Sequence, residues 1–279
     1  MRNYKLRVGG ALTTSIVAAL FSASAAASVN YSFSGGSGQD VTGAAFTAAG
    51  GPNVTVTGWA NTTAAGSTST MADDKLASQT VKLWNGLGVQ NILDGTGSPQ
   101  HSTDNNGPVD MILFSFASDI ALTGLSIGWS QTDSDMSVLA YTGSGAPASL
   151  TGKTYADLTA PGGNWSLISH LSDVSNVSNN SSSITGSATF NNSTSKIFSS
   201  YWLVGAYNPL VGSNMNWTST NDYVKVSGLT GENKPTNGGG QVPEPATLLL
   251  MGAGLVGMTY VRRRREGVAT VKDDSSLSC

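Results

Sequence analysis

The central part of the chain consists of short segments that alternate apolar and polar residues, separated by glycine-rich turns. Alternation with a period of two places one face of a strand in a core and the other in solvent. A nearly all-apolar run, residues 109–116, is typical of a strand buried on both faces. The strand candidates are residues 53–59, 109–116, 120–129, 136–141, 165–171, 184–190, 201–207 and 222–226. This pattern predicts an all-β domain over residues 28–233, an antiparallel sandwich of jelly-roll kind.

The composition excludes several other classes of protein. Charged residues make up 11% of the chain, against about 25% in ordinary soluble proteins, and 34 of the 279 residues are glycine. A helical bundle or coiled coil needs a different composition, and within the β domain short helices are expected at residues 71–76 and 154–158. The net charge of −3, with no visible basic face, argues against nucleic-acid binding. The single cysteine, Cys279, excludes an intramolecular disulfide framework and a cysteine-based zinc site.

The N-terminus has the three parts of a secretory signal peptide. Arg2, Lys5 and Arg7 precede an apolar run over residues 8–21, and small residues with an Ala-x-Ala pattern follow. We therefore expect residues 1–27 to pass through the general secretion machinery and to be removed by signal peptidase after Ala25 or Ala27. The alternative, a retained membrane anchor, is disfavoured because the run is short for a span.

The C-terminus is predicted to cross a membrane once. A flexible linker, residues 234–241, leads to an uncharged run of 16 residues, 246–261, which as a helix would be about 24 Å long. That is slightly short of the roughly 30 Å hydrocarbon core, but flanking arginines can snorkel. The arginines place the tail, residues 266–279, in the cytoplasm and the β domain outside. An ordinary single-span anchor would have the same features.

Residues 242–265 resemble the PEP-CTERM sorting signal of Gram-negative bacteria that make extracellular polysaccharide. The resemblance rests on the order Val-Pro-Glu-Pro, short glycine-containing span, arginine block. It implies recognition by exosortase and cleavage near Pro-Glu-Pro, so that an inner-membrane intermediate becomes a protein of the cell surface or of the biofilm matrix. One departure is that this chain continues for 14 residues after the arginines. The signal residues are Val242, Pro243, Glu244, Pro245, Arg262, Arg263, Arg264 and Arg265.

The central domain has a weaker resemblance to exosortase-dependent surface proteins. It lies in separate pieces, residues 104–110, 113–116, 125–129, 133–135 and 201–207. Because these families have no established activity, the resemblance supports only the location and the β fold.

No catalytic motif is present in the sequence. His101 and His170 do not form a His-Glu-x-x-His motif, and neither a Gly-x-Ser-x-Gly elbow nor a phosphate-binding loop occurs. We therefore predict a noncatalytic protein without a cofactor. One alternative is a carbohydrate-binding module or adhesin for extracellular polysaccharide, with Trp84 and Trp217, which lie near turns, as ligand candidates. A secreted hydrolase is the third alternative, because the members of a Ser-His-Asp triad can be far apart in sequence.

Closely spaced aspartate and asparagine residues raise the question of a calcium site. Asp104, Asn106 and Asp110 flank a glycine turn, and Asp133 and Asp135 form an Asp-x-Asp pair. Such hard oxygen ligands suit Ca²⁺, although neither group matches the EF-hand pattern. The alternative interpretation, which the sequence favours, is turn chemistry in which the side chains bond to the local backbone.

Overall fold

The computed structural model describes residues 27–62, 74–95, 99, 101–175, 184–212, 215–218 and 220–235. One compact unit spans Ala26–Pro235, close to the predicted 28–233. Residues 1–26 of the predicted signal peptide, the sorting signal and the tail lie outside the described residues. Within the part of the chain that is described, no helix is long and apolar enough to cross a membrane.

The described unit contains thirteen strands and one short helix. In chain order the elements are β1 (Ser28–Ser32), β2 (Gln39–Asp40), β3 (Ala45–Phe46), β4 (Val54–Asn61), β5 (Leu76–Leu83), β6 (Leu87–Gln90), β7 (Thr103–Asp104), β8 (Asp110–Thr132), β9 (Met136–Tyr141), α1 (Tyr155–Thr159), β10 (Trp165–Leu171), β11 (Gly186–Thr189), β12 (Ser199–Ala206) and β13 (Asp222–Asn233). The all-β prediction is confirmed.

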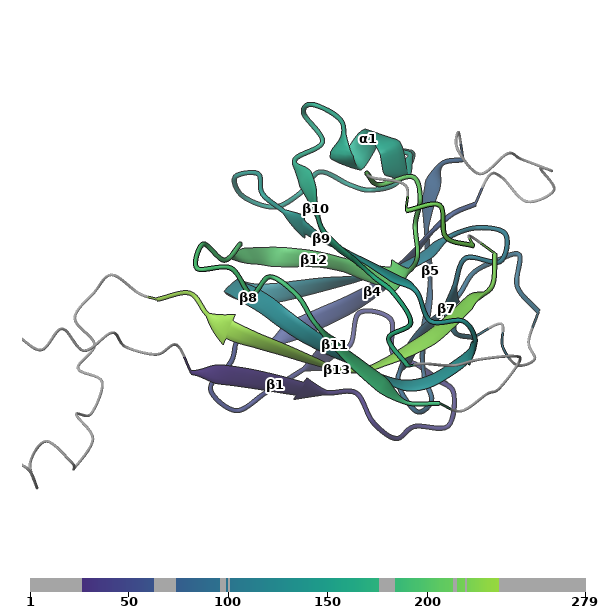
Figure 1. Ribbon diagram of the computed structural model, residues 1–279, viewed down its shortest axis with the longest axis horizontal. Coiled ribbons are helices and arrows are strands. Elements are labelled where there is room, and N and C mark those ends of the chain that lie inside the picture. The colour runs from purple at the N-terminus through teal and green to yellow at the C-terminus, as the bar shows by residue number, and fades with distance from the viewer. Residues whose placement is uncertain are drawn as a thin grey trace, which may run out of the picture. The chain divides into compact units, whose positions relative to one another are not determined.

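The longest strand, β8, belongs to both layers of the fold (Figure 1). Its first part, residues 110–116, pairs with β4 and β12, and its second part, from Ile120 onward, pairs with β13 and β11. Ala117 and Ser118, where the strand passes between the layers, are exposed. All pairings between named strands are antiparallel, and the path β13–β6–β5–β4–β8 closes back on β13. The two segments predicted as separate strands are therefore one continuous strand.

The main core lies between the two layers. Phe114 and Trp202, from the layer that contains β4, β12 and β9, pack in one buried cluster with Ile127, Val226 and Leu229 from the other. Each of these side chains is at most 2% exposed. Period-two alternation along the strands directs these apolar side chains to the inside.

A second apolar cluster covers the outer face of the β4–β8–β12–β9 layer. Met111, Leu139 and Leu203 pack there with Tyr155 and Leu158 of α1. This explains why residues 109–116 are apolar on both faces, as the sequence predicted. The predicted helix at 154–158 is confirmed as α1, which begins at a capping box formed by Thr154 and Asp157.

Other predicted elements differ from the structure. The prediction of a helix at residues 71–76 is wrong for its last residue, because Leu76 is the first residue of strand β5. Residues 71–73 lie outside the described residues. Strand β5 was missed because Ser78, Gln79 and Thr80 interrupt its apolar pattern. Strand β1 alternates clearly, with Val29 and Tyr31 buried, but it directly follows the predicted signal peptide.

Strand β13 connects the two ends of the unit. Its last residues pair with β1, so that Ser28 lies opposite Glu232 and the first and last strands of the unit are neighbours. Its first residues lie about 35 Å away along the strand. There Asp222 and Tyr223 contact β7 and the turn after β8, where acidic residues gather.

Candidate functional site

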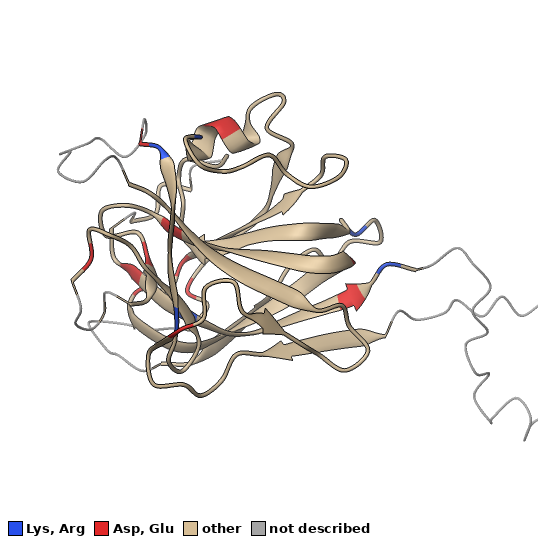
Figure 2. Cartoon of the chain, turned by 180° about the vertical axis from the view of Figure 1, so that it is seen from behind, with Lys and Arg blue, Asp and Glu red and all other residues tan. Residues whose placement is uncertain are grey.

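Two groups of three aspartates lie near the start of β13. We call Asp94, Asp104 and Asp110 the first acidic cluster, and Asp133, Asp135 and Asp222 the second acidic cluster. In each, one carboxylate oxygen from every residue lies within 4.8 Å of the others. Figure 2 shows several of the acidic segments together at one end of the fold. These clusters are the strongest concentration of potential ligand atoms in the described residues.

A turn after β6 positions Asp94 in the first cluster. The Asp94 backbone N–H donates to the carbonyl of Asn91, and Asp94 Oδ2 accepts a hydrogen bond from the Asn91 backbone N–H at 2.9 Å. The Asn91 side chain in turn accepts from the Leu93 N–H at 2.9 Å, and Gln79 accepts from Ile92. Asparagine and aspartate stabilise such turns through these local bonds.

Strand pairing positions the other two members. Asp104 lies in β7 opposite Tyr223 of β13, and Asp110 opens β8 opposite Ala60 of β4. Gly88 allows the chain before β7 to pass close to β6, because a Cβ there would lie 2.1 Å from the carbonyl oxygen of His101. The cluster therefore joins three segments that are separate in the sheet.

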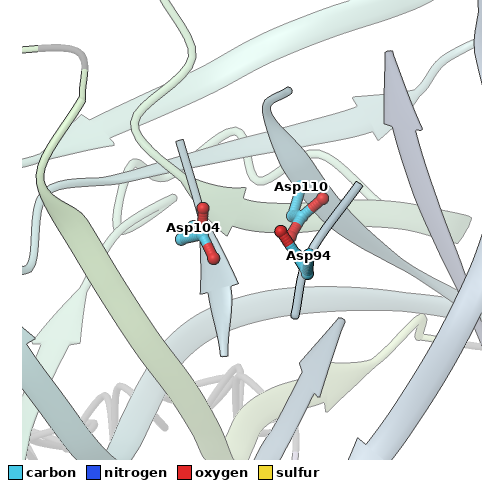
Figure 3. A group of neighbouring side chains, drawn as sticks. All are labelled: Asp94, Asp104 and Asp110. Atoms are coloured by element: carbon cyan, nitrogen blue, oxygen red, sulfur yellow. The ribbon is translucent and has the colours of Figure 1, made fainter. Parts of the chain in front are cut away.

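Asp110 is fully buried, and one of its carboxylate oxygens has no hydrogen-bond partner. Oδ1 accepts from the Asn91 side-chain amide at 3.1 Å, whereas Oδ2 has no partner. Figure 3 shows the Asp110 carboxyl group next to that of Asp94, with Asp104 beside them. A buried polar atom without a partner costs about 1–3 kcal/mol, and more when charged.

Burial raises the pKa of every member of the first cluster. The pKa of Asp104 rises to about 8, first through burial and then through repulsion by Asp94, and the pKa of Asp94 rises to about 6 through burial. The pKa of Asp110 lies well above its usual value, through burial and then repulsion by Asp104 and Asp94. In the described part of the chain, neither lysine nor arginine forms an ion pair with any of the three. The cluster therefore gathers three carboxyl groups without an ion pair to a lysine or arginine of the described chain.

The second cluster is held by hydrogen bonds from the backbone and from an amide. Asp222 Oδ1 accepts from the Asp135 N–H at 2.8 Å, and Oδ2 accepts from the Asn105 side-chain amide at 2.5 Å. Asp135 Oδ1 accepts from the Asp173 N–H at 2.8 Å, and Asp133 Oδ1 accepts from Ser134 at 2.8 Å. Burial, with repulsion by Asp135 and Asp133, raises the pKa of Asp222 to about 8.

Asn105 connects the second cluster to the strand that carries Asp104. Its amide also donates to the carbonyl of Tyr207 at 3.0 Å, and its own oxygen accepts from the Asp222 N–H at 3.0 Å. Asn105 is fully buried. The neighbouring Asn106 contributes a backbone N–H to Asp104 Oδ1 at 3.0 Å, as in an Asx turn.

The structure therefore divides the predicted calcium candidates between two places. Asp104 and Asp110 meet in one cluster and Asp133 and Asp135 in the other, whereas Asn106 contacts Asp104 through its backbone N–H. Asp94 and Asp222 are not among the calcium candidates that the sequence indicates. Asp222 is far from both groups in sequence, and only strand pairing brings it close.

The two tryptophan candidates have different surroundings. Trp84 is 46% exposed and stacks on His101, with ring centroids 5.0 Å apart and planes at 21°. Lys225 Nζ lies 5.3 Å from the centroid of the Trp84 ring. Trp217 is partly exposed and leans on Tyr207 at 52°. Of these two candidates, Trp84 presents the more exposed ring.

Among the described residues, Ser137 and His170 form a serine and histidine pair, but the serine is buried. Ser137 Oγ lies 2.9 Å from His170 Nδ1, and it accepts a hydrogen bond from the Asn208 N–H at 2.8 Å. Ser137 is fully buried. The two side chains therefore connect β9, β10 and the segment after β12, and the Ser137 hydroxyl is not exposed to solvent.

A polar cavity of about 580 Å³ opens beside the first cluster. Asp40, Gln79, Asn91 and Asp94 are among the residues that line it. Asp94 is half-buried, whereas Asp104 and Asp110 are buried. The first cluster is therefore reached from solvent through Asp94.

Comparison with protein families assigns the end of the chain. The family model of the PEP-CTERM protein-sorting motif matches residues 241–265. The chain carries a PEP-CTERM sorting motif. Neither the comparison with curated proteins nor that with solved structures found a match.

The PEP-CTERM match includes every residue of the predicted sorting signal, from Val242 to Arg265. The motif marks an exported surface protein that passes the membrane and has exosortase as its processing partner. The predicted span, residues 246–261, lies within the match and outside the described residues.

Proposed function

We propose that the protein is a noncatalytic component of the cell surface or extracellular matrix, released from a membrane-bound intermediate by exosortase near Pro243–Pro245. Signal peptidase would remove the N-terminal segment, and residues 266–279 would remain on the cytoplasmic side. The observation that carries this proposal is the PEP-CTERM match at residues 241–265.

The position of the motif in the chain supports release of an intact domain. The compact unit ends at Pro235, and its last strand, β13, ends at Asn233. Cleavage near Pro243–Pro245 would therefore cut outside the folded unit. Strand β13, which pairs with β1 and β8, would keep all of its contacts.

The enclosed serine supports a noncatalytic role. A serine nucleophile must reach the substrate, and its base must take its proton. Ser137 Oγ is buried and accepts the Asn208 N–H, so it serves as a structural acceptor. Four of the six aspartates in the two acidic clusters are buried, Asp94 and Asp133 are half-buried, and of the six only Asp94 lines the cavity of about 580 Å³.

The test is the intact mass of the protein recovered from the native cell surface. Cells with exosortase should yield a product that ends between Val242 and Pro245. Cells without exosortase should retain the chain through Cys279, and so should the variant Glu244→Gln in normal cells. Pro235→Ala, which changes a proline outside the motif, is the matched control and should be processed normally. Retention of residues 262–279 in both strains would contradict the proposal.

A carbohydrate-binding role is a second candidate, favoured by the exposed ring of Trp84. Aromatic rings stack on sugars, and the Trp84 ring is stacked on that of His101. Binding to the polysaccharide of the same cells should then weaken at least tenfold in Trp84→Ala. Trp217→Ala, whose ring packs on Tyr207, is the control and should bind normally. Equal binding by the wild type and Trp84→Ala would remove this candidate.

A further inference from the structure

We propose that the first acidic cluster, Asp94, Asp104 and Asp110, binds one divalent cation, with calcium preferred over magnesium. The ion would connect the turn after β6 with β7 and the start of β8.

The spacing of the oxygen atoms fits one calcium ion. Calcium binds oxygen ligands at about 2.3–2.6 Å, so two ligands of the same ion lie at most about 5 Å apart. The carboxylate oxygens of the three aspartates lie within 4.8 Å of one another. Calcium accepts about six to eight oxygen ligands in irregular geometry, whereas magnesium demands near-ideal octahedral geometry and keeps several of its waters. Carboxylates that come from a turn and two separate strands therefore suit calcium better than magnesium.

The unpartnered oxygen of Asp110 is the independent observation that points to a ligand. Asp110 is 0% exposed, and its Oδ2 has no hydrogen-bond partner. Buried carboxylate oxygens are normally satisfied by donors or by a metal, because desolvation without compensation is costly. The Asn91 amide occupies Oδ1 and leaves Oδ2 available beside Asp94.

The local charge also favours a cation. Three carboxylates lie together, and within the described residues the ion pairs are Lys196–Glu232 and Lys234–Asp119, neither of which involves them.

The site has a route for entry of the ion. Asp94 lines the polar cavity of about 580 Å³, so hydrated calcium can reach its carboxylate from solvent. Asp104 and Asp110 lie behind it and are at most 2% exposed. The turn that carries Asp94 is held by Asn91, which also contacts Asp110. Asn91 is therefore a positioning residue for two of the three ligands.

The test is calorimetric titration of the full chain, purified in detergent and freed of metal with a chelator, with calcium chloride. We expect one saturable site per chain, with a dissociation constant of about 10⁻⁴–10⁻³ M, the range of extracellular calcium modules. Asp94→Asn should weaken binding at least tenfold, because it removes a charged ligand but keeps an acceptor for the Asn91 N–H. Asp110→Asn should abolish binding. Asp40→Asn, which changes an aspartate in the same cavity but outside the cluster, is the matched control and should bind like the wild type.

Three results would overturn the proposal. One is that the wild type shows no saturable calcium binding at calcium concentrations up to about tenfold above the expected dissociation constant. Another is an equal loss of affinity in Asp40→Asn and Asp94→Asn, which would indicate only general attraction by the acidic surface. The third is magnesium binding as tight as calcium binding, which would contradict the assignment of the ion. Circular dichroism identifies any variant that fails to fold. Asp94 is half-buried, so Asp94→Asn is expected to fold, and its calcium titration then tests the proposal if Asp110→Asn does not fold.

Discussion

The first and second acidic clusters each consist of three aspartates and lie near the same end of β13, yet the hydrogen bonds to their carboxyl groups differ. In the second, both oxygens of the fully buried Asp222 accept hydrogen bonds, from Asp135 and Asn105. In the first, the equally buried Asp110 has one oxygen bonded to Asn91 and one with no partner. A group of buried aspartates can thus hold the chain together or remain available for a ligand, and the hydrogen bonds distinguish the two.

The largest effect is expected from Asp222→Ala in the second cluster. This change removes the buried acceptor of the Asp135 N–H and one of the two acceptors of the Asn105 side-chain amide. At about 1–3 kcal/mol for each lost partner, the free energy of unfolding should fall by about 4 kcal/mol. Denaturant unfolding should give the same loss in calcium and in chelator. A loss that appears only in calcium would assign the ion to the second cluster.

Calcium itself should have the next largest effect, through the first cluster. A ligand at 100 times its dissociation constant stabilises the folded state by about 2.7 kcal/mol. The wild type and Asp222→Asn should both gain this amount, measured by unfolding with and without calcium. Asp94→Asn should gain almost nothing at the same calcium concentration. An equal gain in the free energy of unfolding for all three proteins would contradict a calcium site in the first cluster.

The pH dependence that Asp222 gives the second cluster should be a smaller effect. The pKa of Asp222 is raised to about 8, so between about pH 4 and 8 the folded protein holds a proton that the unfolded chain releases. Stability from this group is therefore present at low pH and is lost as pH rises towards 8. From pH 6 to 7 in chelator, the wild type should lose about 1.4 kcal/mol more than Asp222→Asn. Parallel pH curves for the two proteins would contradict this reason for the shift.

The smallest effect is expected from Asp110→Asn without calcium. Asparagine retains an acceptor for the Asn91 amide, and it is neutral, like the protonated carboxyl group that the raised pKa of Asp110 favours without calcium. Because the hydrogen bond and the neutral state are both kept, the free energy of unfolding should change by less than about 1 kcal/mol. Unfolding in chelator measures this, with Asp222→Asn as the comparison. A loss above about 3 kcal/mol would mean that Asp110 has a structural role like that of Asp222.

Much of the fold could be predicted because alternation is a local property. The segments 136–141 and 165–171 were predicted with the bounds that the structure has. The apolar run 109–116 indicated burial on both faces, and α1 with the opposite layer provides it. Strand β8 was divided into two because Ala117 and Ser118 are exposed where it changes layer, and exposed small residues are also typical of turns.

The acidic site could be predicted only in part. Asp104 with Asp110, and Asp133 with Asp135, are close in sequence, so their proximity was visible. Asp94 and Asp222 join them through a turn and through the pairing of β13, which are tertiary facts. The hydrogen bonds of Asn91 and Asn105 determine which cluster keeps a carboxylate oxygen without a partner. Both asparagines bond to aspartates that are distant in sequence.

The most direct test of the difference between the clusters is a crystal structure grown in calcium, with anomalous diffraction recorded at a long wavelength. We predict one anomalous peak, bounded by the carboxylates of Asp94, Asp104 and Asp110, and none between Asp133, Asp135 and Asp222. A peak in the second cluster, or none in the first, would contradict it.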